Sequence, residues 1–169
     1  MVARLAKAAA AAARWNTEPG QNIPSMLQKQ HALTIIMPVL NEAAGMAAAL
    51  AALAPSITNG AQVIVVDGGS TDASVAMALA SQSPAITVVQ TGPGRALQMN
   101  AGAAHANGKA LLFLHVDTAL PQNADELVSQ ALANGGLVWG RFDVRIEGRS
   151  AWLPVISLLM NLRSRLTGI

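Results

Sequence analysis

The sequence predicts an α/β protein with a doubly wound, mostly parallel sheet. Short apolar segments alternate with helical segments along most of the chain, which is the pattern of parallel sheets covered by helices. The second apolar segment is β-branched from Val63 to Val66, as expected for a strand buried on both faces. Every apolar segment ends in polar or glycine residues. The segments are Leu33–Val39, Gln62–Asp67, Ile86–Val89 and Ala110–Leu114.

The most informative stretch is Ile64–Asp72, Ile-Val-Val-Asp-Gly-Gly-Ser-Thr-Asp. The acid Asp67 closes the strand, and Gly68 and Gly69 allow a tight turn that brings backbone close to a ligand. Ser70 or Thr71 can then cap a helix, with Asp72 in its first turn. Open α/β sheets bind nucleotides at such strand ends.

The remaining elements follow in order. Pro38, near the end of the first strand, removes a ladder donor, so pairing should stop there. The late segment Leu137–Glu147 alternates apolar and polar residues, which predicts a half-exposed antiparallel strand. Helices are expected over Ala43–Ala54, ended by Pro55, and over Ser70–Ser81, Arg95–Ala106, Pro121–Ala133 and Ala151–Leu166.

Composition limits the function classes. The chain has no cysteine, which excludes thiolate metal sites and cysteine nucleophiles. Its net charge of +2 comes from basic residues near the start, and without them the chain is almost neutral, so no nucleic-acid partner is expected. Residues 1–30 are predicted to be a basic, alanine-rich extension and linker, disordered or loosely helical. The domain is expected to span 31–169.

No apolar run approaches the roughly 18 residues of a membrane span. The run Trp152–Met160 is short and is interrupted by Pro154. A cytoplasmic location is expected, with peripheral attachment to the inner face of the plasma membrane as the alternative.

The carboxyl ends of parallel strands meet at one edge of a sheet, so the residues after the four strands should converge. Asp67 has two interpretations: it accepts hydrogen bonds from a nucleoside, or it binds N–H groups of its own turn. Asp72 and Glu42 can either face the site or stabilise a helix start, and Asn41 can be a simple cap.

Asp117, just after a buried strand, suits a hard divalent cation, Mg²⁺ or Mn²⁺, that also holds phosphate oxygens. His115 would point the same way, as a metal ligand, a phosphate donor or a neutral structural histidine. Arg95 opens a helix after a glycine loop, where a cation and free N–H groups suit a diphosphate. A surface ion pair is the alternative.

Other nucleotide and hydrolase motifs are absent from the sequence. Gly92-Pro93-Gly94 lacks the third glycine of a dinucleotide fingerprint, and there is no Gly-Lys-Ser/Thr. No Gly-x-Ser-x-Gly elbow occurs, which disfavours a serine hydrolase.

Taken together, these motifs resemble family 2 glycosyltransferases, inverting enzymes with a GT-A fold. Ile-Met-Pro-Val-Leu-Asn-Glu and Val-Val-Asp-Gly-Gly-Ser-Thr-Asp look like the first strand and the nucleotide-binding turn of that family. Three later motifs are similar to a bacterial subgroup associated with radical-SAM and selenoprotein-type domains. They are Gly-Arg-Ala-Leu-Gln-Met-Asn-Ala-Gly, Leu-Phe-Leu-His-Val-Asp-Thr and Trp-Gly-Arg-Phe-Asp.

The resemblance implies transfer of a sugar from a UDP- or GDP-sugar to an acceptor, a lipid or a glycan, with a divalent cation. Asp117 would be the metal-binding acid of the Asp-x-Asp motif, whose first acid is replaced here by His115. The nucleotide-sugar site would comprise Pro38, Asn41, Glu42, Asp67, Gly69, Asp72 and Arg95.

The catalytic base is the least defined part of this expectation. In the family the base comes from the region after the alternating strand. Here Asp143, late in the chain, is the available acid, and a solvent-facing strand residue is its alternative interpretation. The segment that usually carries it, shortly after the Arg-Ser-Arg-Leu-Thr-Gly helix end, is expected to be missing, so a C-terminally shortened chain is predicted. Two alternatives remain open: a nucleotidyltransferase, and a nucleotide-binding fragment without catalytic activity.

Overall fold

The computed structural model describes residues 4–7, 33–133 and 139–167. Six strands form one sheet in the order β4-β3-β2-β5-β1-β6. Strands β2 to β5 are parallel neighbours, which confirms the predicted α/β fold with a parallel sheet. Their bounds are β2 (Leu33–Val39), β3 (Gln62–Asp67), β4 (Ile86–Gln90) and β5 (Ala110–Phe113).

Strand β1 (Arg4–Lys7) lies between β5 and β6 (Trp139–Arg141) and is antiparallel to both. The antiparallel pairing predicted for the late strand is therefore present, with β1 as its partner. A strand at residues 4–7 was not expected from the sequence, which predicts a disordered or loosely helical extension there. Both neighbouring strands present unpaired backbone groups on that side, and β1 pairs with them. The other residues of 1–30 lie outside the described residues.

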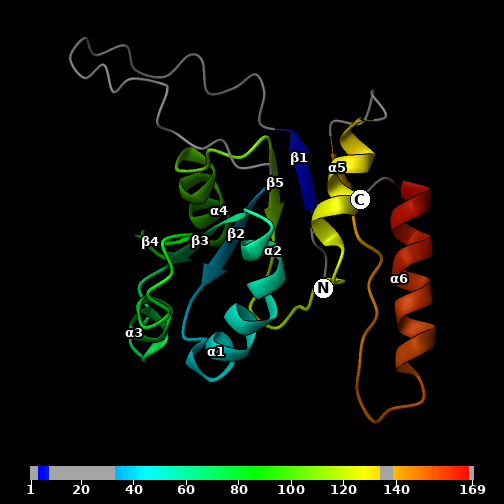
Figure 1. Ribbon diagram of the computed structural model, residues 1–169. Coiled ribbons are helices and arrows are strands. Elements are labelled where there is room, and N and C mark those ends of the chain that lie inside the picture. The colour runs from blue at the N-terminus through cyan, green and yellow to red at the C-terminus, as the bar shows by residue number, and fades with distance from the viewer. Residues whose placement is uncertain (1–3, 8–32, 134–138, 168–169) are drawn as a thin grey trace.

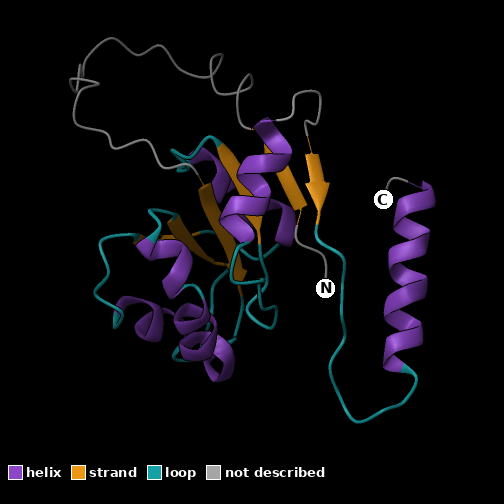
Figure 2. Ribbon diagram, turned by 45° about the vertical axis from the view of Figure 1, so that its right-hand side comes forward, coloured by secondary structure: helices purple, strands orange, loops and turns teal. Residues whose placement is uncertain are grey.

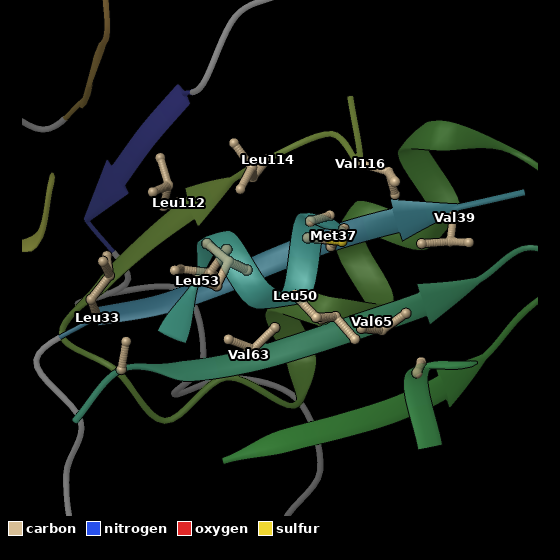
Figure 3. Packing of buried hydrophobic residues seen from close by; sticks show 14 of the residues in the cluster. Leu33, Met37, Val39, Leu50, Leu53, Val63, Val65, Leu112, Leu114 and Val116 are labelled. Carbon is tan, nitrogen blue, oxygen red and sulfur yellow. The ribbon is translucent and has the colours of Figure 1, made fainter. Parts of the chain in front are cut away.

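Alternate residues of the central strands point to opposite faces of the sheet. On one face Leu33, Met37, Val39, Val63 and Val65 form the larger core (Figure 3). Helices α1 (Ala43–Ala52), α2 (Ala54–Thr58), α3 (Ser74–Leu79) and α5 (Ala124–Ala133) contribute to this core or lie beside it.

Helix α4 (Arg95–Ala104) covers the opposite face, against Ile36, Ile64 and Val66 (Figure 1). A Cβ added at Gly102 would overlap Ile36 Cγ2, so this glycine lets the helix backbone approach the sheet closely. Helices on both faces confirm the doubly wound arrangement.

Helix α6 (Leu153–Thr167) stands at the rim of the molecule, after an extended segment that follows β6 (Figure 2). Its polar side chains turn inward: Ser157 accepts from Ile146 N–H, and Asn161 exchanges two hydrogen bonds with Val144. Of the strand predicted over Leu137–Glu147, β6 covers Trp139–Arg141, and residues 137–138 lie outside the described residues. Beyond Arg141 the backbone bonds to side chains of α6 instead of to a neighbouring strand.

The helix bounds differ from expectation where local hydrogen bonding intervenes. The helix predicted over Ala43–Ala54 divides in two, because Pro55 occupies the first turn of α2. The helix predicted from Ser70 begins at Ser74, because residues 67–72 form hydrogen-bonded turns. In the described part of the chain, no helix is long and apolar enough to cross a membrane.

Candidate functional site

The polar residues after the parallel strands lie along one edge of the sheet. The register places Val39 beside Asp67 and Asp67 beside Gln90, so the first three of these turns start at the same level. Each contains a residue in the left-handed region: Asn41 at φ 56°, Gly69 at φ 95° and Gly94 at φ 139°. Glycine adopts such a φ readily, whereas at Asn41 it costs energy, and strained residues of this kind cluster at binding sites.

Asp67 is buried, with 2% of its surface exposed. Its carboxylate accepts hydrogen bonds from Gly69 N–H at 3.2 Å and Ser70 N–H at 3.0 Å. The sequence left two interpretations of Asp67 open. The structure contains the contacts of the second, in which the carboxylate accepts hydrogen bonds from N–H groups of its own turn. Asp67 fixes the shape of the turn and leaves Gly69 at its outer end.

Asn41 ties the first turn to the second. Its N–H donates to Ser70 Oγ at 2.9 Å, and its Oδ1 accepts from Thr71 N–H at 2.8 Å. Asparagine is among the few residues other than glycine that tolerate a positive φ. The side chain therefore both permits the turn after β2 and joins it to the turn after β3.

Asp72 stabilises the start of α1 from outside that helix. It accepts from Ala43 N–H at 3.0 Å and from Ser74 N–H at 2.9 Å, while Ser74 Oγ accepts from Glu42 N–H at 2.8 Å. The hydrogen bond from the Ser74 hydroxyl is the main reason why the pKa of Asp72 is lowered, followed by that from Ala43. The carboxylate of Glu42 makes no hydrogen bond within the described residues and is exposed.

Gln98 of α4 is a residue that the sequence analysis did not single out. It is 4% exposed, and its Nε2 donates to Val39 O and Val66 O, both at 2.8 Å. The available signal is its position: it shares the inward helix face with Ala101 and Gly102, where an apolar residue is the norm.

Arg95, His115 and Asp117 influence one another electrostatically. The pKa of His115 is lowered, first by burial of the ring and then by the positive charge of Arg95, while Asp117 acts in the opposite direction. Arg95 is the first residue of α4 and makes no hydrogen bond or ion pair with the described residues. Asp117 is exposed and accepts from the Thr118 hydroxyl at 3.3 Å.

These residues can hold a divalent cation only with help from a ligand. Within the described ranges there is no group of three histidine, cysteine or acidic residues able to bind a metal. One carboxylate suits Mg²⁺ or Mn²⁺ when substrate phosphates and water complete the shell, and a neutral imidazole would suit a Mn²⁺-like ion better than Mg²⁺. The donor set therefore fits a cation that arrives with a phosphate-bearing ligand.

A cavity of about 570 Å³ adjoins Asp117, lined by residues 117–121 and 142–147. Asp143 lies in this lining, but both its oxygens are engaged, one by Arg141 at 3.2 Å and the other by Arg165. Pro38 lies one residue before the end of β2, in register with Val66. A second cavity, about 540 Å³, lies among α1, α2 and α3 and has no charged side chain in its lining.

Comparison with known proteins identifies the family. The family model described as glycosyl transferase family 2 matches residues 34–167. A search of curated proteins finds no match. The mannosyltransferase PcManGT from Pyrobaculum calidifontis, in complex with GDP-Man and Mn²⁺, is 26% identical with a TM-score of 0.52, over 71% of this chain and 36% of its own.

Two further structures resemble the fold at lower identity. S. aureus TarS in complex with UDP-GlcNAc is 22% identical with a TM-score of 0.54, over 60% of this chain and 31% of its own. Glucosyl-3-phosphoglycerate synthase from Mycobacterium tuberculosis in complex with UDP is 22% identical with a TM-score of 0.52, over 89% of this chain and 57% of its own. The chain thus spans between about a third and somewhat over half of the length of these enzymes. Because the family model covers most of the sequence, this chain belongs to glycosyl transferase family 2.

Proposed function

We propose that this chain binds a nucleotide-sugar donor at the carboxyl edge of its sheet and takes part in transferring the sugar to an acceptor with inversion at the anomeric carbon. The observation that carries the proposal is the joining of the turns after β2 and β3 on the edge that also holds Arg95 and Asp117. Membership of glycosyl transferase family 2 and the likeness to a mannosyltransferase that binds GDP-Man and Mn²⁺ support it.

The nucleoside would lie against the turns after β2 and β3. Pro38, Asn41, Glu42 and Gly69 border this position, and Glu42 has a free carboxylate for a ribose or base donor. Asp67 and Asp72 would act mainly by holding these turns, because their oxygens already accept backbone N–H groups. A carboxylate has about four lone-pair sites, so each can still accept one ligand bond.

The diphosphate would lie toward Arg95, whose guanidinium is free to form charge-assisted hydrogen bonds with phosphate oxygens. Asp117, with His115 beside it, would hold Mg²⁺ or Mn²⁺. The lowered pKa of His115 keeps its ring neutral near pH 7, with a lone pair available. The cation would neutralise charge on the departing nucleoside diphosphate.

The acceptor hydroxyl has to lose a proton during a single displacement. Neither oxygen of Asp143 is free to receive this proton, because one pairs with Arg141 and the other with Arg165. Binding of the donor without turnover by this chain is therefore the second candidate, favoured by these two ion pairs.

We also propose that the acceptor is presented at an anionic lipid surface, with the chain bound peripherally to it. The outward stripe of α6 is apolar, and Trp152 at its start is 71% exposed. Arg149 and Arg163 are exposed beside it, and residues 148–167 contain no acid. Apolar stripes with basic flanks bind membrane interfaces. The stripe comprises Trp152, Val155, Ile156, Leu159, Leu162 and Leu166.

Sedimentation with vesicles tests this surface. Binding to vesicles that contain phosphatidylglycerol, weakened by Leu159→Ser or Arg163→Glu, is the expected result. Equal recovery with and without vesicles, or a dimer in solution that the same changes dissociate, would contradict it.

Titration calorimetry with UDP, GDP and their sugars, with and without Mn²⁺, tests donor binding. We expect Mn²⁺-dependent binding that Asp117→Asn and Arg95→Gln each weaken. Asp143→Asn serves as the matched control, because it removes an acid of the same cavity that is ion-paired already. Absence of binding by every nucleotide, or equal loss in the control, would contradict the proposal.

A further inference from the structure

We infer that Gln98 is a positioning residue that holds three loops of the proposed donor site in one arrangement. The geometry of this inference comes from the contacts of Gln98. Its consequence for donor binding rests on the proposed function. The three loops are the turns after β2, β3 and β4, which begin after Val39, Asp67 and Gln90.

The side-chain amide of Gln98 uses both of its hydrogens. Nε2 donates to Val39 O and to Val66 O at 2.8 Å, the two carbonyls just before the Asn41 turn and the Asp67 turn. Val39 O also accepts from Gly68 N–H at 2.9 Å. One buried group therefore fixes the separation of the ends of β2 and β3.

The amide of Gln98 reaches these two carbonyls from outside the sheet ladder. A carbonyl oxygen has two lone pairs, so Val39 O can accept from Gly68 N–H and from Gln98 at the same time. The inward polar side chain on α4 therefore adds donors at the level where the pairing of β2 with β3 ends.

Gln98 also fixes the helix that carries Arg95. Its own N–H donates to Gly94 O at 2.9 Å, in the first turn of α4. The side-chain bonds to the strand ends then set the position of this first turn relative to Asn41 and Asp67. The guanidinium proposed to meet the diphosphate is therefore placed by the same residue as the turns proposed to meet the nucleoside.

Gly68 shows how closely the amide is held. A Cβ at position 68 would lie 2.9 Å from Gln98 Cδ and Nε2, which is closer than real contacts allow. The φ of Gly68 is not positive, so alanine is compatible with the backbone and the clash is its main effect. Gly68→Ala therefore displaces the Gln98 amide without changing residue 98.

Thr34 provides a matched control on the same strand. It is buried, donates to Gln62 Oε1 at 2.8 Å and accepts from Gly108 N–H at 3.0 Å, at the opposite end of β2. Thr34→Val removes two part-buried hydrogen bonds, and Gln98→Met removes two buried ones. A purely structural role of Gln98 predicts the same effects for both changes.

The first test is amide hydrogen exchange of the protein without nucleotide, together with its denaturation midpoint. The amides of Asn41, Ser70 and Thr71 report on the joined turns, because they donate the bonds described above. When the two variants have the same denaturation midpoint, these amides should exchange about tenfold faster or more in Gln98→Met than in Thr34→Val. An increase of this size is expected from the loss of buried hydrogen bonds. Gly68→Ala should give the same local pattern, which keeps the test valid if Gln98→Met does not fold.

The second test is coupling between the two positions. Gln98→Ala removes the atoms that an alanine at 68 would meet, so the double variant should exchange no faster than Gln98→Ala alone. Additive effects, or equal exchange at the three amides in Gln98→Met and Thr34→Val, would overturn the inference. Since no nucleotide is present, this result is separate from failure of the proposed function, which calorimetry of the unaltered chain reveals.

Discussion

Asn41 offers a quantitative test of the joined turns, because two replacements separate its two roles. Asn41→Gly keeps a residue that accepts φ 56° but removes the hydrogen bond that Thr71 N–H donates to Oδ1. Asn41→Ala removes the same bond and also places an ordinary side chain in the left-handed region. We expect alanine to be the more destabilising replacement, although alanine is usually favoured over glycine.

The magnitudes follow from the geometry. An exposed hydrogen bond contributes about 0.5–1.5 kcal/mol, and a left-handed residue with a Cβ costs about 1–2 kcal/mol. Glycine avoids the second cost but loses about 0.5–1 kcal/mol through the flexibility of the unfolded chain. The free energy of unfolding should fall by about 2 kcal/mol for Asn41→Ala. The fall for Asn41→Gly should be smaller than this, with a difference of about 1 kcal/mol between the two variants.

Urea denaturation followed by circular dichroism measures this difference. With a slope of about 2 kcal/mol per molar urea, the two midpoints should differ by about 0.5 M. Equal midpoints, or a lower midpoint for glycine, would refute the assignment of a strained residue that links the two turns.

Four further predictions concern charge and packing. Because the pKa of Asp72 is lowered, its contribution to stability is present above the unfolded value of 3.8 and is lost as the pH falls through the folded value; Asp72→Asn should flatten acid denaturation in this range. Arg95→Gln should raise the pKa of His115 in an NMR titration, because it removes a neighbouring positive charge; an unchanged pKa of His115 would contradict an electrostatic effect of Arg95 on this ring. Gly102→Ala should lower the free energy of unfolding by about 1–3 kcal/mol through overpacking against β2, and an unchanged midpoint would contradict the close helix approach. Asn161→Ala leaves the N–H and the C=O of Val144 without these partners, at a cost of about 1–3 kcal/mol; limited proteolysis should then cut next to α6 first, and an unchanged pattern would argue against this attachment.

The central strands were predictable because a strand that is buried on both faces has a continuous apolar sequence. The apolar runs ending at Val39 and Asp67 match β2 and β3 at both ends. Strand β1 was not predictable, because its four residues resemble the basic, alanine-rich sequence around them and its pairing depends on distant strands. Likewise, the helix start at Ser74 is set by contacts with Asn41 and Ala43, which are about thirty residues away in the sequence.

The convergence of the candidate residues at one edge of the sheet could be predicted, but the contacts of each residue could not. Parallel topology alone puts the Asp67 turn, Arg95 and Asp117 on one edge. Whether a carboxylate faces a ligand or its own turn depends on local geometry, and Asp67 and Asp143 both proved to be engaged by neighbours. Gln98 was not singled out from the sequence because its partners are backbone carbonyls, and the spacing of residues in the sequence does not reveal them.

The most direct test of donor binding at this edge is a crystal structure of the chain soaked with GDP or UDP and Mn²⁺. We expect the anomalous signal of Mn²⁺ beside Asp117, the diphosphate near Arg95 and the nucleoside against the turn formed by Asn41 and residues 67–72. A nucleotide bound in the uncharged cavity among α1, α2 and α3, or a cation remote from Asp117, would contradict the proposed site.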